Sequence, residues 1–225
     1  HHTAEPKLPP AIAVVNPNRL DDESGEGHLA AVGVAFLLVV AINRELRRLD
    51  WYVERTEPDL THWLDLVALG TVCDVVPLKG LNRALVIQGL KVLQRRGNQG
   101  LRALTDAAAI NEPPTAYHLG FVIGPRVNAG GRVGSADLGA RLLTTAVETE
   151  TQDLAQRLEI LNQERQMIET VVLDEAMNQL AKVPPGAVVV AVGYSWHPGV
   201  IGIVASRLKE RFNRPAIVIS MDPDS

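Results

Sequence analysis

Four groups of residues in this 225-residue chain could bind metal or phosphate. His1 and His2 offer paired imidazoles, although a histidine pair at a terminus is also typical of an affinity-tag remnant. Asp74 lies in the apolar run 66–78, where a buried carboxylate needs a hydrogen bond, an ion pair or a metal. Asp74 is therefore either a structural or helix-capping aspartate or a ligand of a hard divalent cation such as Mn²⁺ or Mg²⁺.

The third group lies in the segment 124–132, which reads Gly-Pro-Arg-Val-Asn-Ala-Gly-Gly-Arg. We expect a glycine-rich loop here, because consecutive glycines favour irregular backbone. Arg126 and Arg132 can grip phosphate through paired hydrogen bonds, and Asn128 adds an amide. Glycine amides can also cradle an anion. The segment is therefore either a phosphate-binding loop or a turn with surface arginines.

The fourth candidate, His197, lies between a predicted strand and a predicted helix. Ligands of α/β units bind at this kind of junction, so His197 is either a phosphate contact or a turn residue. The remaining candidates, Glu26, His28, His62 and His118, lack partners at metal-ligand spacing and are interpreted as structural. The sequence contains no phosphate-loop or dinucleotide fingerprint, no zinc-type Cys/His set and no nucleophile elbow.

Periodicity and turn signals predict the elements that position these residues. The C-terminal order of strand, helix and strand predicts a parallel pair with a right-handed crossover, and hence the α/β class. The helix over 148–182 would be roughly 50 Å long and is interpreted as a rigid connector between two lobes. The predicted helices are 28–49, 60–78, 82–95, 148–182 and 200–211, and the predicted strands are 11–15, 187–192 and 216–220.

The composition, with 46% hydrophobic and 21% charged residues, is that of a soluble globular protein. A single cysteine, Cys73, excludes an internal disulfide, so a disulfide-stapled secreted fold is not indicated. The apolar run 29–42 is shorter than the roughly 18–20 residues that span a bilayer, and we expect a buried helix there. A cytoplasmic protein is expected.

Charge is unevenly distributed along the chain. The formal net charge is −4, and residues 141–182 carry 8 acidic against 4 basic side chains. Residues 79–132 instead carry 8 basic side chains against 2 acidic ones. Such a basic stretch can neutralise phosphates even in an acidic protein, although a solvated helix face is the alternative.

Five segments together resemble the RecJ-type single-stranded-DNA-specific 5′→3′ exonucleases of the DHH/DHHA1 phosphoesterase superfamily. The resemblance extends over essentially the whole chain, in the family's order, and it favours a catalytic origin of the histidine pair over a tag. The segments are His1-His2-Thr3 with Val15-Asn16-Pro17-Asn18, then 31–36, 68–78, 124–128 and 197–207.

The resemblance implies a phosphodiesterase with two Mn²⁺ or Mg²⁺ ions, which polarise the phosphate and generate hydroxide. It implies that His1 and Asp74 are metal ligands and that His2 is the catalytic residue at the scissile phosphate. It also implies single-stranded DNA as substrate, a role in DNA repair and recombination, and a single-strand-binding protein or helicase as partner. The residues implied to contact the DNA are Arg126, Asn128, Arg132 and His197.

The resemblance further divides the chain into domains. Residues 1–145 would be the C-terminal part of a DHH domain, 146–183 the interdomain connector helix, and 184–225 the start of a DHHA1-type domain. The family's earlier aspartate motifs are absent from this sequence, so we expect the full-length protein to be the exonuclease and this segment alone to be inactive. The alternatives are a DHH phosphodiesterase of short oligonucleotides or cyclic dinucleotides and a catalytically dead DHH binding or scaffold protein.

Overall fold

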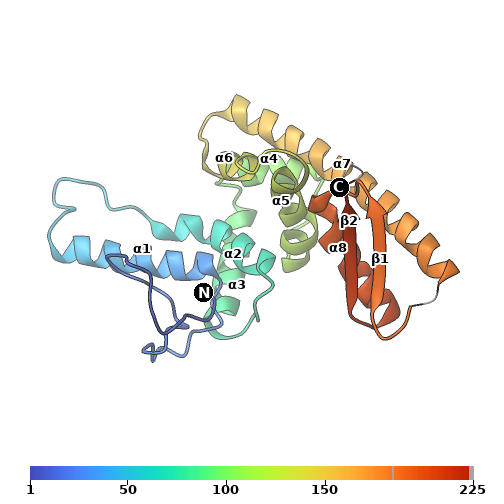
Figure 1. The fold of residues 1–225 in the computed structure, drawn as a ribbon. Helices are drawn as coiled ribbons and strands as arrows, with labels where there is room; N and C mark the ends of the chain where they lie inside the picture. Colours follow the sequence, from blue (N-terminus) through green and yellow to red (C-terminus); the bar gives the residue numbers. More distant parts are fainter. Residues whose placement is uncertain (184, 223–225) are drawn as a thin grey trace. The chain divides into compact units, whose positions relative to one another are not determined.

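The computed structural model describes residues 1–183 and 185–222, which form two compact units, His1–Gly124 and Pro125–Ser225 (Figure 1). The first unit is helical in its described part, and the second combines helices with a two-stranded parallel sheet. The predicted α/β class is confirmed. In the described part of the chain, no helix combines the length and the apolar character needed to cross a bilayer.

The first unit is built around helix α2. Its elements are α1 (Ala31–Arg48), the 3₁₀ turn η1 (Leu60–Trp63), α2 (Leu64–Cys73), α3 (Gly80–Gln94), α4 (Gln99–Ala107) and the π-helical turn η2 (His118–Ile123). The buried residues of α2 cover more than half of its circumference, as expected of a helix that packs against α1, α3, η1 and η2. Leu64 and Val67 of α2 pack with Leu85 and Val92 of α3 in one hydrophobic cluster.

The close packing of α2 on α3 depends on Gly89. A Cβ atom at this position would lie 2.1 Å from the carbonyl oxygen of Leu64 and 2.5 Å from the Cβ of Ala68. Because the nearest atom belongs to the backbone, a side chain here would force the two helices apart. Gly89 therefore fixes the spacing between α3 and α2, the helix that leads to Asp74.

Two expectations for the first unit are wrong. Residues 11–15 form no strand, and Ile12 in their middle is fully exposed. An isolated extended segment has no partner for its backbone groups, which explains why a short β-like run alone did not produce a strand. Helix α1 is also not buried as a whole, because Leu37, Leu38, Val40 and Ile42 are each more than a third exposed.

The second unit consists of helices and strands that are arranged along one long helix (Figure 1). The 35-residue helix α7 confirms the predicted helix and its bounds, but the expected glycine-rich loop is wrong, because helix α5 occupies those residues. The elements are α5 (Gly124–Val133), α6 (Leu138–Thr144), α7 (Glu148–Lys182), β1 (Val189–Tyr194), α8 (Pro198–Phe212) and β2 (Ala216–Met221).

The two strands are parallel and in register from Val189 opposite Ala216 to Tyr194 opposite Met221, which confirms the predicted parallel pair. Their buried residues form one core with α7 and α8, which includes Val172, Val189 and Val204. The outer edge of β1 is bound by α7, since Gln179 accepts a hydrogen bond from the Val192 N–H at 3.2 Å and donates one to the Val192 carbonyl at 2.7 Å.

The compact units are divided at Gly124, whereas the predicted domains are divided at residues 145 and 183. Helix α7 lies within the second unit and packs against α6, α8 and β1. The predicted domains refer to the domains of the resembled family, and that assignment stays a prediction.

Candidate functional site

His1 and Asp74 meet in the first unit. The Nδ1 atom of His1 lies 3.3 Å from Oδ2 of Asp74, and their side chains are 17% and 36% exposed. The expected burial of the Asp74 carboxylate is wrong, because α2 ends at Cys73 and Asp74 follows at the surface. The apolar run therefore carries this carboxylate to a partly exposed position beside the histidine.

The backbone directly after Asp74 is strained. Val75 has a positive φ of 58° and its side chain is 87% exposed. The position after a helix end often adopts this left-handed conformation, but glycine usually occupies it because a β-branched side chain is unfavourable there. Such strain is most common at functional sites.

His2 lies next to His1, with 4.2 Å between the ring centroids, and is exposed. The backbone of both histidines is held by asparagine side chains: Asn18 donates to the His1 carbonyl at 2.7 Å and Asn16 donates to the His2 carbonyl at 2.9 Å. The structure therefore brings together the three residues predicted for metal binding and catalysis, His1, His2 and Asp74.

An imidazole nitrogen and a carboxylate oxygen are both suitable ligands for Mn²⁺. The close approach of His1 and Asp74 fits their binding one shared cation. Within residues 1–183 and 185–222, however, no group of three or more His, Cys, Asp and Glu side chains could hold a metal ion. These two ligands therefore form at most part of a metal site.

In the second unit, Arg126 and Arg132 have different surroundings although both belong to α5. Arg126 forms a largely buried salt bridge with Glu159 of α7, and the two side chains are 16% and 13% exposed. Arg132 and Asn128 are exposed, and their i,i+4 spacing puts them on the same side of the helix. Of the predicted phosphate contacts on α5, Asn128 and Arg132 are the accessible ones.

Arg132 also lies close to His197. Its guanidinium donates to the carbonyl of Gly199 at 3.1 Å, and a Cβ on Gly199 would lie 2.2 Å from the Arg132 carbonyl oxygen. Gly199 in turn donates its N–H to Nδ1 of His197, which caps helix α8, at 3.0 Å. Because Nδ1 accepts this hydrogen bond, the neutral imidazole carries its proton on Nε2 and can donate it to an anion.

Among the described residues, the most deeply buried carboxylate is one that the sequence analysis did not single out. Asp65 in the first turn of α2 is 1% exposed; its Oδ1 accepts from the Leu66 N–H, while its Oδ2 has no hydrogen-bond partner. Burial raises the pKa of the Asp65 carboxyl. Asp65 lies between Leu64 and Leu66, and this apolar context, the same signal that was used for Asp74, could have indicated a buried carboxylate. Burial likewise raises the pKa of the Cys73 thiol.

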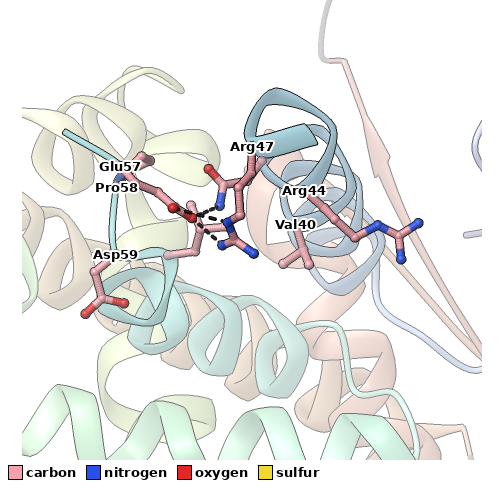
Figure 2. A pocket seen from close by; sticks show the side chains of 8 residues that line it. Val40, Arg44, Arg47, Glu57, Pro58 and Asp59 are labelled. Carbon is pink, nitrogen blue, oxygen red and sulfur yellow. Dashed lines mark hydrogen bonds and ion pairs between the residues drawn. The ribbon is translucent and has the colours of Figure 1, made fainter. Parts of the chain in front are cut away.

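A pocket of about 500 Å³ lies between α1 and residues 57–60, apart from all the predicted site residues (Figure 2). Two of its charged groups, Arg47 and Glu57, are engaged with each other. Glu57 accepts hydrogen bonds from Arg47 and from Asn43, and these contacts lower the pKa of the Glu57 carboxyl. The pocket has no feature that connects it with the predicted chemistry.

Comparison with known proteins gives consistent matches. No family profile matches the chain. The chain is 41% identical over 233 residues to the single-stranded-DNA-specific exonuclease RecJ of Dickeya dadantii (strain 3937), covering 98% of this chain. It is 40% identical over 232 residues to the protein of the same name from Haemophilus influenzae, covering 100% of this chain. In both cases the chain spans 40% of the relative's length.

Solved structures agree with these matches. A crystal structure of exonuclease RecJ bound to manganese has a TM-score of 0.80 and 37% identity, covering 98% of this chain and 53% of that one. RecJ from Thermus thermophilus in complex with Mg²⁺ has a TM-score of 0.72 and 36% identity, covering 91% of this chain and 30% of that one. Over 91–100% of its length, this chain is therefore similar in sequence and in fold to a part of the RecJ exonucleases.

Proposed function

We propose that this chain is part of a cytoplasmic 5′→3′ exonuclease that hydrolyses single-stranded DNA with Mn²⁺ or Mg²⁺ during DNA repair and recombination. One observation carries the proposal: His1 and Asp74, far apart in the sequence, lie 3.3 Å apart in a chain that resembles metal-bound RecJ structures. A single-strand-binding protein or a helicase is the proposed protein partner.

In this proposal His1 and Asp74 each supply one ligand to a divalent cation, and further ligands come from outside the described residues. The bound cations supply the polarisation of the phosphate and the activation of water. His2, exposed and adjacent to His1, donates a hydrogen bond to a non-bridging oxygen of the scissile phosphate. That contact orients the phosphodiester and stabilises negative charge that develops on it.

The proposed DNA contacts in the second unit are Arg132, Asn128, His197 and Arg126. Arg132 and Asn128 are exposed, and the Nε2–H of His197 is the donor that remains after helix capping. Arg126 already binds Glu159, so we expect its contribution to phosphate binding to be smaller than that of Arg132. These donors suit the phosphate backbone, because guanidinium and imidazole groups bind phosphate oxygens regardless of base.

Helix α3 of the first unit supplies a further basic surface. Four basic residues in or directly next to the helix are exposed and recur at multiples of four residues, so they form a stripe that winds around roughly half of the helix. The helix contains no acidic residue. Such a stripe supports sequence-independent attraction of a phosphate backbone. The residues are Lys79, Arg83, Lys91 and Arg95.

The proposal is tested with the full-length RecJ-type protein that carries this chain. We expect Asp74→Ala and His1→Ala each to lower Mn²⁺-dependent hydrolysis of 5′-phosphorylated single strands by at least about 100-fold, since removing a ligand costs at least as much as removing a residue that orients one. The matched control is Asp106→Ala. It also removes an aspartate of the first unit that forms an ion pair, here with Arg96, and it should retain activity. Unchanged turnover in both variants would exclude these residues from the metal site.

A further inference from the structure

We propose that Asn16 and Asn18 are positioning residues that hold His1 and His2 in place for metal and phosphate. The proposal rests on the function proposed above, since it takes the roles of the two histidines from it. We call the two asparagines, with Pro17 between them, the asparagine clamp. Nothing in the resemblance or in the names of the relatives assigns a role to the clamp.

The clamp joins two segments of irregular backbone. Asn18 Nδ2 lies 2.7 Å from the carbonyl oxygen of His1, and Asn16 Nδ2 lies 2.9 Å from that of His2. A third hydrogen bond runs from the Ala4 N–H to the Asn18 carbonyl at 3.4 Å. Residues 1–4 belong to no helix or strand, so their backbone is fixed by contacts of this kind. The direction of each imidazole therefore depends on the two amides.

Asparagine is suited to this role because its side chain both accepts and donates. The Oδ1 of Asn16 accepts from the Asn18 N–H at 2.9 Å, which closes a local turn, while its Nδ2 remains available for His2. Pro17 fixes its own φ in this turn and has no N–H to satisfy. The backbone hydrogen bond from Arg19 to Asn16 at 3.2 Å completes the turn.

Asn18 is also tied to a third segment. Its Nδ2 donates to the Gly27 carbonyl at 2.8 Å, and a Cβ on Gly27 would lie 2.7 Å from its Oδ1. The amide is therefore held from two sides, with both the His1 and the Gly27 carbonyls as acceptors. An amide fixed in this way can fix His1 in turn, and His1 then meets Asp74 without a large loss of conformational entropy.

Groups that orient metal ligands without touching the metal typically contribute 10–100-fold to metal affinity or activity. Asn18 lies behind His1, a proposed ligand, whereas Asn16 lies behind His2, the proposed phosphate contact. The two halves of the clamp therefore have different predicted effects: Asn18 acts mainly on metal affinity, and Asn16 acts mainly on turnover and its dependence on the DNA.

The test uses full-length protein and measures the Kd of Mn²⁺ by electron paramagnetic resonance of the free ion, alongside kcat and KM for single-stranded DNA. Asn18→Ala should raise the Mn²⁺ Kd about 10–100-fold. Asn16→Ser, whose hydroxyl can still close the turn but is too short to reach His2, should keep the Mn²⁺ Kd and lower kcat. The matched control is Asn43→Ala, which removes a buried asparagine of the same unit that binds Glu57 and should change none of these values.

The outcomes separate this inference from the proposed function. If His1→Ala weakens Mn²⁺ binding while Asn18→Ala and Asn16→Ser behave as the unmodified protein, the clamp has no positioning role and the proposed function stands. A loss of affinity in Asn43→Ala equal to that in Asn18→Ala would also overturn the clamp, because it would show a general effect of destabilisation. If His1→Ala leaves Mn²⁺ binding unchanged, the proposed metal site fails, and the clamp fails with it.

Discussion

Asp65 in the first turn of α2 and Asp74 directly after its last residue have opposite environments, although they lie only nine residues apart. Asp74 is partly exposed beside His1, whereas Asp65 is buried with one oxygen unpaired. Both residues have apolar neighbours along the chain, and for Asp74 this context predicted a buried carboxylate. Asp74 is partly exposed because helix α2 ends at Cys73, directly before it. Composition along the run does not specify that stop, especially since Val75 takes the left-handed position usual for glycine.

Asp65 leads to a pH-dependent prediction. Burial raises its folded-state pKa above the unfolded value, so ionised Asp65 costs stability at neutral pH, and stability is gained as the pH falls through the raised pKa. We expect Asp65→Asn to increase the free energy of unfolding at pH 7 by about 1–3 kcal/mol, the range for an unsatisfied buried group. That gain should disappear below the pKa of an unfolded aspartate.

The measurement for Asp65 is urea unfolding of the protein that carries this chain, at pH 7 and at acidic pH. Asp106→Asn is the control at an exposed position, where no such gain is expected because the carboxylate is paired with Arg96. A loss of stability in Asp65→Asn at pH 7 would show that the ionised carboxylate is needed in the folded protein.

At the scale of elements, regular patterns predicted the structure well. The bounds of α7 followed from a long stretch without Gly or Pro with apolar residues at helical spacing, and the parallel pair followed from β-branched runs on either side of a helical segment. Helix α5 could not be predicted in this way. Its glycines disfavour helix locally, but a Cβ on Gly130 would lie 2.6 Å from the Ser135 carbonyl oxygen, and Arg126 is bound to Glu159. Tertiary contacts of this kind override local propensity.

The packing of α2 on α3 supplies a prediction about an element. Gly89→Ala should lower the free energy of unfolding by about 3 kcal/mol, because the new methyl group overlaps the Leu64 carbonyl and the helices must separate. Gly97→Ala is the matched control, since a Cβ there meets no atom within 4 Å. Circular dichroism during thermal unfolding compares the two variants. Equal stability of Gly89→Ala and the unmodified protein would contradict the close approach of the helices.

At the scale of the whole molecule, net charge was a poor guide and its distribution was informative. The acidic excess lies in 141–182, which includes all of α7. Within the basic stretch 79–132, some cations are already paired with carboxylates of the protein: Arg96 binds Asp106 at the surface, and Arg126 binds Glu159 in a largely buried salt bridge. The exposed stripe on α3 and the exposed side of α5 remain as the parts suited to phosphate.

The candidate residues belong to different compact units: His1, His2 and Asp74 lie in the first, and Arg132 and His197 lie in the second. The chain spans about 40% of the length of its curated relatives, and its described residues hold no complete metal cluster. The motif resemblance predicted His1, His2 and Asp74 as metal and catalytic residues, and the structure brings them together, while their roles stay predictions. The salt bridge of Arg126 could not be predicted, because its partner Glu159 lies 33 residues away in the sequence.

The most direct measurement is nucleotide release by the full-length protein in Mn²⁺, with an end label on the DNA strands and chromatography of the products for a cyclic dinucleotide. Three substrates of equal nucleotide concentration decide the result: a 5′-phosphorylated single strand, the same strand in a blunt duplex, and a cyclic dinucleotide. We predict that the single strand is degraded from its 5′ end, and that the duplex and the cyclic dinucleotide are left intact. Hydrolysis of the cyclic dinucleotide alone, or no hydrolysis of any substrate, would contradict the proposed exonuclease.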